Sequence, residues 1–133
     1  ATVNAAEELL MLEYSQRLAT RQRNVGASAE QPHVATALTL SAVQGGAQAS
    51  GRAVAGLAAG QRADFVVLDA QHIALQGLGT PDLVSAHVFP SHRTSAIDSV
   101  WAGGQERVHA GRHALHGDAA AAFALARSQL LKD

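Results

Sequence analysis

The fold is decided by the stretch Gly51-Arg-Ala-Val-Ala-Gly-Leu-Ala-Ala-Gly-Gln-Arg-Ala-Asp-Phe-Val-Val-Leu-Asp69. Its first ten residues contain three glycines, which predicts an irregular loop. Four consecutive apolar residues, 65–68, then stand between two aspartates. A short apolar run bounded in this way indicates a strand whose two faces are both covered. The stretch therefore predicts a loop that leads into a β-containing part of the chain.

Two helices are expected upstream, over residues 5–23 and 33–49. Asn4 and Glu7 have the spacing of a capping box, which starts the first helix near residue 5. Apolar residues recur along this helix at spacings of three and four, which places them on one face: Val3, Ala6, Leu10, Tyr14 and Leu18. Neighbouring leucines and a methionine widen that face beyond what a lone surface helix needs. We therefore expect the helix to lie between two layers.

The second helix contains two consecutive glycines, Gly45 and Gly46. Each costs about 1 kcal/mol relative to alanine inside a helix. Close backbone packing against a neighbour would explain them, and so would an early end of the helix. Gly51 has the place of a C-cap in either case.

The downstream residues predict a short helix near 82–89 that Pro90 stops, and then a β-hairpin. Its strands fall at 96–102 and 106–110, with Gly103 and Gly104 as the tight turn. A last helix follows within 115–133, capped by Gly117 and Asp118. The order of elements predicts an α+β fold in which a few strands accompany several helices.

Composition excludes several classes of function. The 133 residues carry a net charge of −1 and only 16% charged residues, so nothing indicates a nucleic-acid partner. The chain has no cysteine, which rules out disulfides and thiolate metal sites. No stretch reaches the roughly 18 apolar residues of a membrane span. The N-terminal residues lack the basic, apolar and small-residue order that is typical of a signal peptide. The lack of cysteine is compatible with the cytosol, and we expect a cytoplasmic protein.

Three segments carry a family resemblance. Residues 7–18 and 21–25, which contain the runs Leu-Glu-Tyr-Ser-Gln-Arg-Leu and Arg-Gln-Arg-Asn, look like the last barrel helix of formimidoylglutamate deiminases. These enzymes belong to the amidohydrolase superfamily. Residues 51–69 are similar to the segment by which the superfamily leaves its catalytic barrel, and residues 100–113 resemble its closing hairpin. The resemblance covers nearly the whole chain.

The resemblance implies how the chain is organised. Residues 1–50 would be the C-terminal helices of a metal-dependent (β/α)8 barrel. Residues 51–114 would contribute strands to an accessory β-sandwich domain, with the short helix near 82–89. Residues 115–133 would form a C-terminal helix. The implied fold class is an α+β fragment of an amidohydrolase, and the implied partner is the remainder of the parent barrel.

The resemblance also implies a parent activity. Such an enzyme hydrolyses the C–N bond of its small-molecule substrate, N-formimidoyl-L-glutamate, to give N-formyl-L-glutamate and ammonia in histidine degradation. Its barrel holds one divalent metal, commonly zinc, through a His-x-His pair, a further histidine and an aspartate. This chain has no His-x-His pair. We therefore assign no catalytic, cofactor-binding or metal residue to it, and expect it alone to be structural, inactive and free of bound metal.

The histidines are the first alternative candidates for a site. His109, His113 and His116 are the densest group, but residues four apart on a strand stand roughly 13 Å from each other, too far for one ion. We interpret them as exposed polar positions on the closing hairpin. His87 and His92 flank Pro90 and are given the same interpretation.

The other candidates are hydroxyl, carboxylate and guanidinium groups. The serines 41, 85, 91 and 95 lack the Gly-x-Ser-x-Gly context of a nucleophile. Asp64 and Asp69 bracket a strand, where aspartate is usual turn chemistry. Arg21 and Arg23 are interpreted as solvated or salt-bridged rather than as an anion site.

Two other functions stay open. One is a fragment of another amidohydrolase, of the aminopyrimidine or guanine deaminase or chlorohydrolase type. The other is a non-enzymatic α+β interaction module, which the wide apolar face of the first helix disfavours. That face is also why we expect a homodimer or self-association.

Overall fold

The computed structural model describes residues 3–90 and 94–131. Four helices are present in this part of the chain: α1 (Ala5–Thr20), α2 (Val34–Ser50), α3 (Thr80–Val88) and α4 (His116–Leu130). Four strands accompany them: β1 (Phe65–Leu68), β2 (Ile97–Ala102), β3 (Gln105–His109) and β4 (Arg112–His113). All neighbouring strands run antiparallel in the order β1-β2-β3-β4. The expected α+β fold is confirmed at this level.

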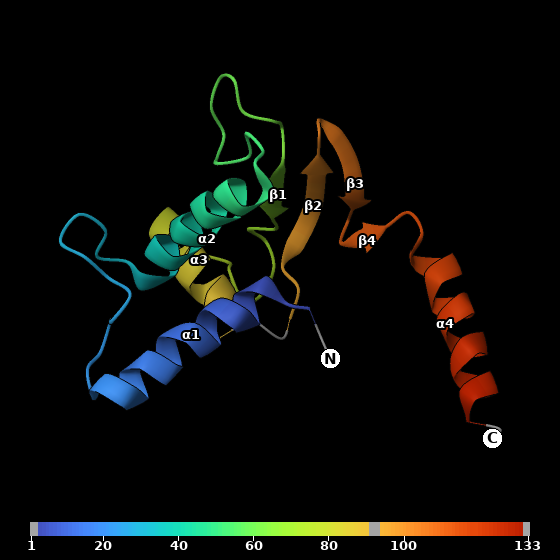
Figure 1. Cartoon of the computed structure of the whole chain (residues 1–133), viewed down its shortest axis with the longest axis horizontal. Coiled ribbons are helices and arrows are strands. Elements are labelled where there is room, and N and C mark those ends of the chain that lie inside the picture. Colours follow the sequence, from blue (N-terminus) through green and yellow to red (C-terminus); the bar gives the residue numbers. More distant parts are fainter. Residues whose placement is uncertain (1–2, 91–93, 132–133) are drawn as a thin grey trace.

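The elements group into three parts (Figure 1). Helices α1, α2 and α3 lie together beside the β1 side of the sheet, whereas α4 extends away beyond β4. The order of the strands in the sheet is their order in the sequence, so each strand pairs with the one that follows it along the chain. No helix within residues 3–90 and 94–131 has both the length and the apolar character needed to cross a membrane.

Local sequence signals set the ends of these elements. The Asn4 side chain accepts from the amides of Ala6 and Glu7, so the predicted N-cap of α1 is confirmed. Gly51 caps α2 in the left-handed conformation, with φ of 63°. Gly103 and Gly104 have φ of 61° and 74°, which a two-residue hairpin turn of type I′ requires.

Two predicted boundaries were wrong. α1 ends at Thr20 rather than near residue 23, because Arg21 adopts a left-handed conformation with φ of 56° and stops the helix. α4 begins at His116, with Leu115 as its N-cap, so Gly117 and Asp118 lie inside the first turn instead of capping it.

The helical layer has a small core made by Leu10, Ala35 and Val88, one residue from each of α1, α2 and α3. Only part of the predicted apolar face of α1 reaches it. Ala6 and Leu10 are buried, but Val3 and Leu18 are 103% and 82% exposed, and Tyr14 is 43% exposed. Much of the predicted face is therefore exposed in this chain, since α2 and α3 contact only a portion of α1 (Figure 1). This exposure is what the expected self-association through the first helix requires.

A second core joins the helices to the sheet. Leu75, in the turns after β1, is completely buried against Ala86 of α3 and Ala96 just before β2. Leu68 of β1 and Leu83 of α3 pack around them. This cluster contains residues from the sheet, from α3 and from the loop between them, so it fixes the helical layer relative to β1 and β2.

Strand β1 is less covered than its sequence predicts. Val66 and Val67, which point to opposite faces of the sheet, are 53% and 40% exposed. The expectation of two covered faces was wrong within this chain because β1 is an edge strand and the described residues supply no complete layer on either side. Helix α2 is likewise uncovered at Gly45 and Gly46, since a Cβ added at either residue would meet nothing within 4 Å.

A buried carboxylate holds α1 to the loop that follows it. Glu13 is 1% exposed, and its Oε1 accepts from Arg17 Nε at 2.7 Å and from the Val25 amide at 3.0 Å. Its Oε2 accepts from the Gly26 amide at 2.9 Å. Three donors thus compensate for the desolvation of one charge.

The surroundings of Glu13 are tightly shaped. A Cβ on Gly26 would lie 3.0 Å from Leu38 Cδ2, which explains the glycine at this position. On the other side, the Arg17 guanidinium lies over the Tyr14 and Phe89 rings, at 5.2 and 5.7 Å from their centroids. The two rings stack at 5.9 Å and so connect α1 with the end of α3.

Replacing Glu13 with glutamine is expected to lower the free energy of unfolding by about 1–3 kcal/mol at pH 7, because the buried donors lose a charged acceptor. Burial raises the pKa of Glu13, but the hydrogen bonds from Arg17, Gly26 and Val25 outweigh it and leave that pKa below its usual 4.5. The stabilisation is therefore complete above pH 4.5 and is lost as the pH falls through the lower, folded-state pKa. Urea unfolding across this range measures both effects.

The matched control is Glu8→Gln, an exposed carboxylate on the same helix. It should change the free energy of unfolding by no more than about 0.5 kcal/mol. Equal losses in the free energy of unfolding from the two substitutions would show that the buried Glu13 carboxylate stabilises the fold no more than an exposed one.

Truncating Leu75 to alanine is expected to cost about 2–5 kcal/mol of stability, since it empties the cluster between α3 and the sheet. Ile73 is the control, because it lies two residues away in the same turns and is 86% exposed. Ile73→Ala should leave the thermal midpoint nearly unchanged. A small effect at Leu75, comparable with that at Ile73, would contradict the assignment of Leu75 to the core.

Candidate functional site

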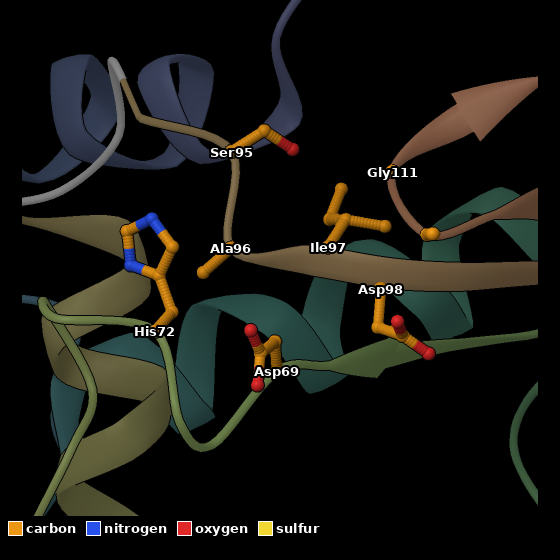
Figure 2. Close-up of a pocket in the computed structure, with 8 residues that line it drawn as sticks. Asp69, His72, Ser95, Ala96, Ile97, Asp98 and Gly111 are labelled. Atoms are coloured by element: carbon orange, nitrogen blue, oxygen red, sulfur yellow. The ribbon is translucent and has the colours of Figure 1, made fainter.

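An open cavity of about 260 Å³ lies where the chain leaves β1 and enters β2 (Figure 2). It is lined by Asp69, His72, Ser95, Ala96, Ile97, Asp98, Ala110 and Gly111. Two carboxylates, one imidazole and one hydroxyl line it, so we consider what chemistry it could support. Its walls are the 69–72 turn, the start of β2 and the turn before β4.

The polar groups of the 69–72 turn, which forms one wall of the cavity, already make hydrogen bonds within or next to that turn. Asp69 Oδ1 accepts from the Gln71 amide at 2.8 Å, and the Asp69 amide donates to the Ala96 carbonyl at 2.8 Å. His72 Nδ1 accepts from the Ala74 amide at 3.2 Å. These bonds close an Asx-type turn and extend the β1–β2 ladder, which is the usual work of aspartate after a strand.

The remaining groups do not converge on one reacting atom. Figure 2 shows the Ser95 hydroxyl directed away from the His72 ring, and the Asp98 carboxylate standing apart from that of Asp69. A nucleophile needs a base within about 2.6–3.2 Å of its proton. The cavity can present negative charge to a cationic group, but it does not assemble a serine nucleophile with a base.

The three densest histidines remain separate. His109 lies at the end of β3 and pairs through Nδ1 with Glu106 Oε1 at 3.1 Å, with 82% of its side chain exposed. His113 of β4 accepts at Nδ1 from the Leu115 amide at 3.1 Å. His116 opens α4. His109 and His113 thus each bond to a residue that lies within three positions of them in the sequence.

The described residues do not fit a metal ion. No group of three or more histidine, aspartate or glutamate side chains comes together within residues 3–90 and 94–131 in a way that could hold one. A catalytic zinc needs three protein ligands that converge within about 2.0–2.2 Å of it. This part of the chain therefore offers no site for the divalent metal that the sequence resemblance implies.

The remaining candidate residues either have structural roles or lie exposed on the surface. Asp64 Oδ1 accepts from the Gly103 amide and so ties the loop before β1 to the hairpin turn. The Ser85 hydroxyl donates to the Pro81 carbonyl at 3.3 Å, and Arg21 forms the C-cap of α1. Arg23 and Ser41 are exposed. Ser91 and His92 lie outside the described residues.

His87 is less exposed than the sequence suggests. It lies on α3, and its Nδ1 is buried without a hydrogen-bond partner among the described residues. Burial lowers the pKa of this imidazole, which keeps it neutral at physiological pH. A weak signal was present in the sequence, because His87 stands between the apolar residues Ala86 and Val88. Both neighbours are buried in the structure.

Sequence analysis also missed Glu13 as a structural centre. The available signal was its position three residues after Leu10 and four before Arg17, on the buried side of α1 with a cation one turn away. Glutamate is seldom fully buried unless it is paired. The amides that make its burial possible come from the loop at residues 25 and 26, which no helical periodicity reveals.

No protein-family profile matches the chain, but both a curated protein and solved structures do. The chain is 36% identical, over 130 residues, to the formimidoylglutamate deiminase of Pseudomonas aeruginosa. The match takes in 98% of this chain and 28% of the relative. Nearly all of the chain therefore resembles just over a quarter of that protein.

Structural comparison agrees. An amidohydrolase crystal structure from Brucella melitensis superposes with a TM-score of 0.83 and 36% sequence identity, again over 98% of this chain and 28% of the other. These matches confirm the resemblance inferred from the sequence. Along nearly its whole length, the chain is similar to one segment of formimidoylglutamate deiminase, and it fits a C-terminal fragment of such an amidohydrolase.

Proposed function

We propose that this chain is a structural part of a formimidoylglutamate deiminase, a hydrolase acting on non-peptide C–N bonds. The observation that carries the proposal is the 36% identity over 98% of the chain, since a match of that length is hard to reconcile with an unrelated interaction module. The parent reaction is the hydrolysis of N-formimidoyl-L-glutamate to N-formyl-L-glutamate and ammonia. The proposed location is the cytoplasm.

The described residues have structural roles in this proposal. α1 and α2 are the last helices of the barrel, β1–β4 belong to the accessory β-domain, and α4 is a C-terminal helix. The catalytic residues and the divalent metal, which we expect to be zinc, belong to the remainder of the parent. The lack of converging ligands within the described part of this chain supports that division.

The exposed apolar residues support the remainder of the barrel as a partner. On α1, Met11 and Leu18 are 57% and 82% exposed, and on α2 Leu40 is 50% exposed. Gly45 and Gly46 leave room on α2 for a close backbone approach. Apolar surface of this kind on neighbouring helices indicates a layer that packs against another part of a protein.

The chain by itself is expected to release no ammonia from N-formimidoyl-L-glutamate at any zinc concentration, because its described residues bring no metal ligand set together. Elemental analysis after dialysis against zinc should find far less than one ion per chain. Equimolar zinc, or measurable turnover that survives repurification, would overturn the structural role proposed here.

Transplanting this chain into its relative tests the proposal directly. We expect a chimera, in which it replaces the matching segment of the Pseudomonas aeruginosa protein, to hydrolyse N-formimidoyl-L-glutamate within about tenfold of the parent. The same chimera carrying Leu75→Ala should lose thermal stability and with it activity, which provides an internal control. A folded chimera without deiminase activity would count against the proposal. Activity on guanine in its place would favour the other amidohydrolase type.

The isolated chain is also expected to self-associate through the exposed face of α1. Leu18→Glu should reduce binding of an apolar dye and lower the weight-average mass in sedimentation equilibrium, since it places a charge in that face. Leu57→Glu, at a loop position that is 77% exposed, is the control. A monomeric chain with little dye binding would contradict this prediction.

A further inference from the structure

Helix α3 connects the two apolar clusters of the described chain. Val84 and Val88 pack in the cluster shared with α1 and α2. Leu83 and Ala86 pack in the cluster shared with Leu75 and the sheet. Because successive residues of a helix are turned by about 100°, these two pairs lie on two different sides of α3. A change in the position of α3 therefore affects both clusters at once.

His87 lies on the part of the α3 surface between these two sides. It follows Leu83 by four residues and Val84 by three, so its side chain lies beside both of them on the helix. The residue is partly buried, and its Nδ1 is enclosed without a hydrogen-bond partner. Among the described residues, it is the one side-chain nitrogen or oxygen with this property. A buried polar atom without a partner is uncommon in folded proteins and needs an explanation.

The enclosed nitrogen suits only one of the two charge states of the ring. A neutral imidazole carries one hydrogen, and with that hydrogen on Nε2 the Nδ1 atom of His87 keeps a bare lone pair. An imidazolium ion carries a hydrogen on each nitrogen. Protonation at this place would therefore create a buried N–H donor without an acceptor, on a charged ring between apolar clusters.

The surroundings of His87 offer the charged ring no compensation within the described residues. Helix α2 contains no titratable residue. Glu13 of α1 already accepts from Arg17 and from two loop amides, and His72 accepts from the Ala74 amide. Burial is the sole cause that lowers the pKa of His87, so no neighbouring carboxylate opposes it. The titratable groups considered on the elements packed against α3 are Glu7, Glu13, Tyr14 and Arg17 of α1, and Asp69 and His72 after β1.

We propose that His87 is a pH-sensitive switch that controls how firmly α3 packs against the two clusters. The neutral ring occupies the junction between them, and α3 then contacts both. The charged ring must move from the junction into water, which weakens the packing of α3 and so loosens the helical layer from the sheet. The switch depends on α3 and its neighbours, and stands whether or not the parent is a deiminase.

The direction of the pH dependence follows from the burial of the ring. Burial disfavours the charged form, so the pKa of His87 in the folded chain lies below its ordinary value of 6.5. The stabilisation is therefore complete above pH 6.5 and decreases as the pH falls below that value, because the unfolded chain then binds more protons. Loss of the Glu13 contribution begins only below pH 4.5, so the two effects occupy different ranges.

Proton NMR of the histidine rings tests the charge state in the unaltered chain. The His87 ring is expected to titrate at a lower pH than the ring of His33, which is exposed and makes no side-chain cap to α2. Loss of one signal in His87→Gln, and of another in His33→Gln, assigns the two titrations. A midpoint for His87 at or above that of His33 would overturn the proposal.

Urea unfolding between about pH 5 and 8 tests the effect on stability, since this is the range in which histidine changes charge. The urea midpoint of the unaltered chain should fall as the pH is lowered. His87→Leu should make this fall much smaller, because an apolar side chain then occupies the junction at every pH. The matched control His33→Gln should keep the full pH dependence. Equal pH dependence in the two variants would contradict the switch.

Amide hydrogen exchange locates the effect and is read on the unaltered chain, so it does not require that a variant folds. After correction for the intrinsic effect of pH on exchange, the α3 amides should lose protection at low pH relative to those of β2 and β3. Equal loss of protection in α3, β2 and β3 would show that acid destabilises the whole fold without a specific effect on α3, and would overturn the proposal.

Discussion

The helical layer depends on one buried charge. Glu13 can be buried because the chain turns back and presents the amides of Val25 and Gly26 to it, while Arg17 supplies the counter-charge from the next turn of α1. Without these donors a desolvated carboxylate would be strongly unfavourable. The same contacts fix where α2 begins relative to α1, because the loop between the helices is held at its first turn. The small apolar core of Leu10, Ala35 and Val88 lies between the three helices, two of which these contacts hold together.

The structure nevertheless leaves many large apolar side chains exposed. A self-contained domain of this size buries most of its large apolar side chains. Here α1 keeps Leu18 exposed, β1 keeps Val66 exposed and α4 buries nothing. The three elements lie in different parts of the molecule (Figure 1). The chain spans 28% of the length of the relatives it matches, and the exposed surface of α1 is the one for which we propose the remainder of a barrel as partner.

Sequence patterns predicted the elements better than their surroundings. The N-cap at Asn4, the C-cap at Gly51 and the turn at Gly103 and Gly104 act within a few residues, so the start of α1, the end of α2 and the hairpin were foreseen. Burial was predicted less well. Periodicity states which residues share a face, but not whether another element covers it, so Tyr14 and Val66 were expected to be more buried than they are. The role of Glu13 could not be foreseen because its amide donors lie in a loop.

The candidate site shows the same division between local and long-range information. Sequence chemistry alone offered histidines, serines and aspartates, and the structure engages Asp64, Asp69 and His113 in turns and strand ends. Catalysis needs groups from separate segments to converge within hydrogen-bond distance. Among the described residues, no group of three or more histidine, aspartate or glutamate side chains comes together in a way that could hold a metal ion. Function was therefore inferred from the match of a whole segment to an enzyme rather than from any site. A segment that positions helices and strands can be diagnostic of an enzyme while contributing none of its reacting groups, because packing constrains many residues and chemistry only a few.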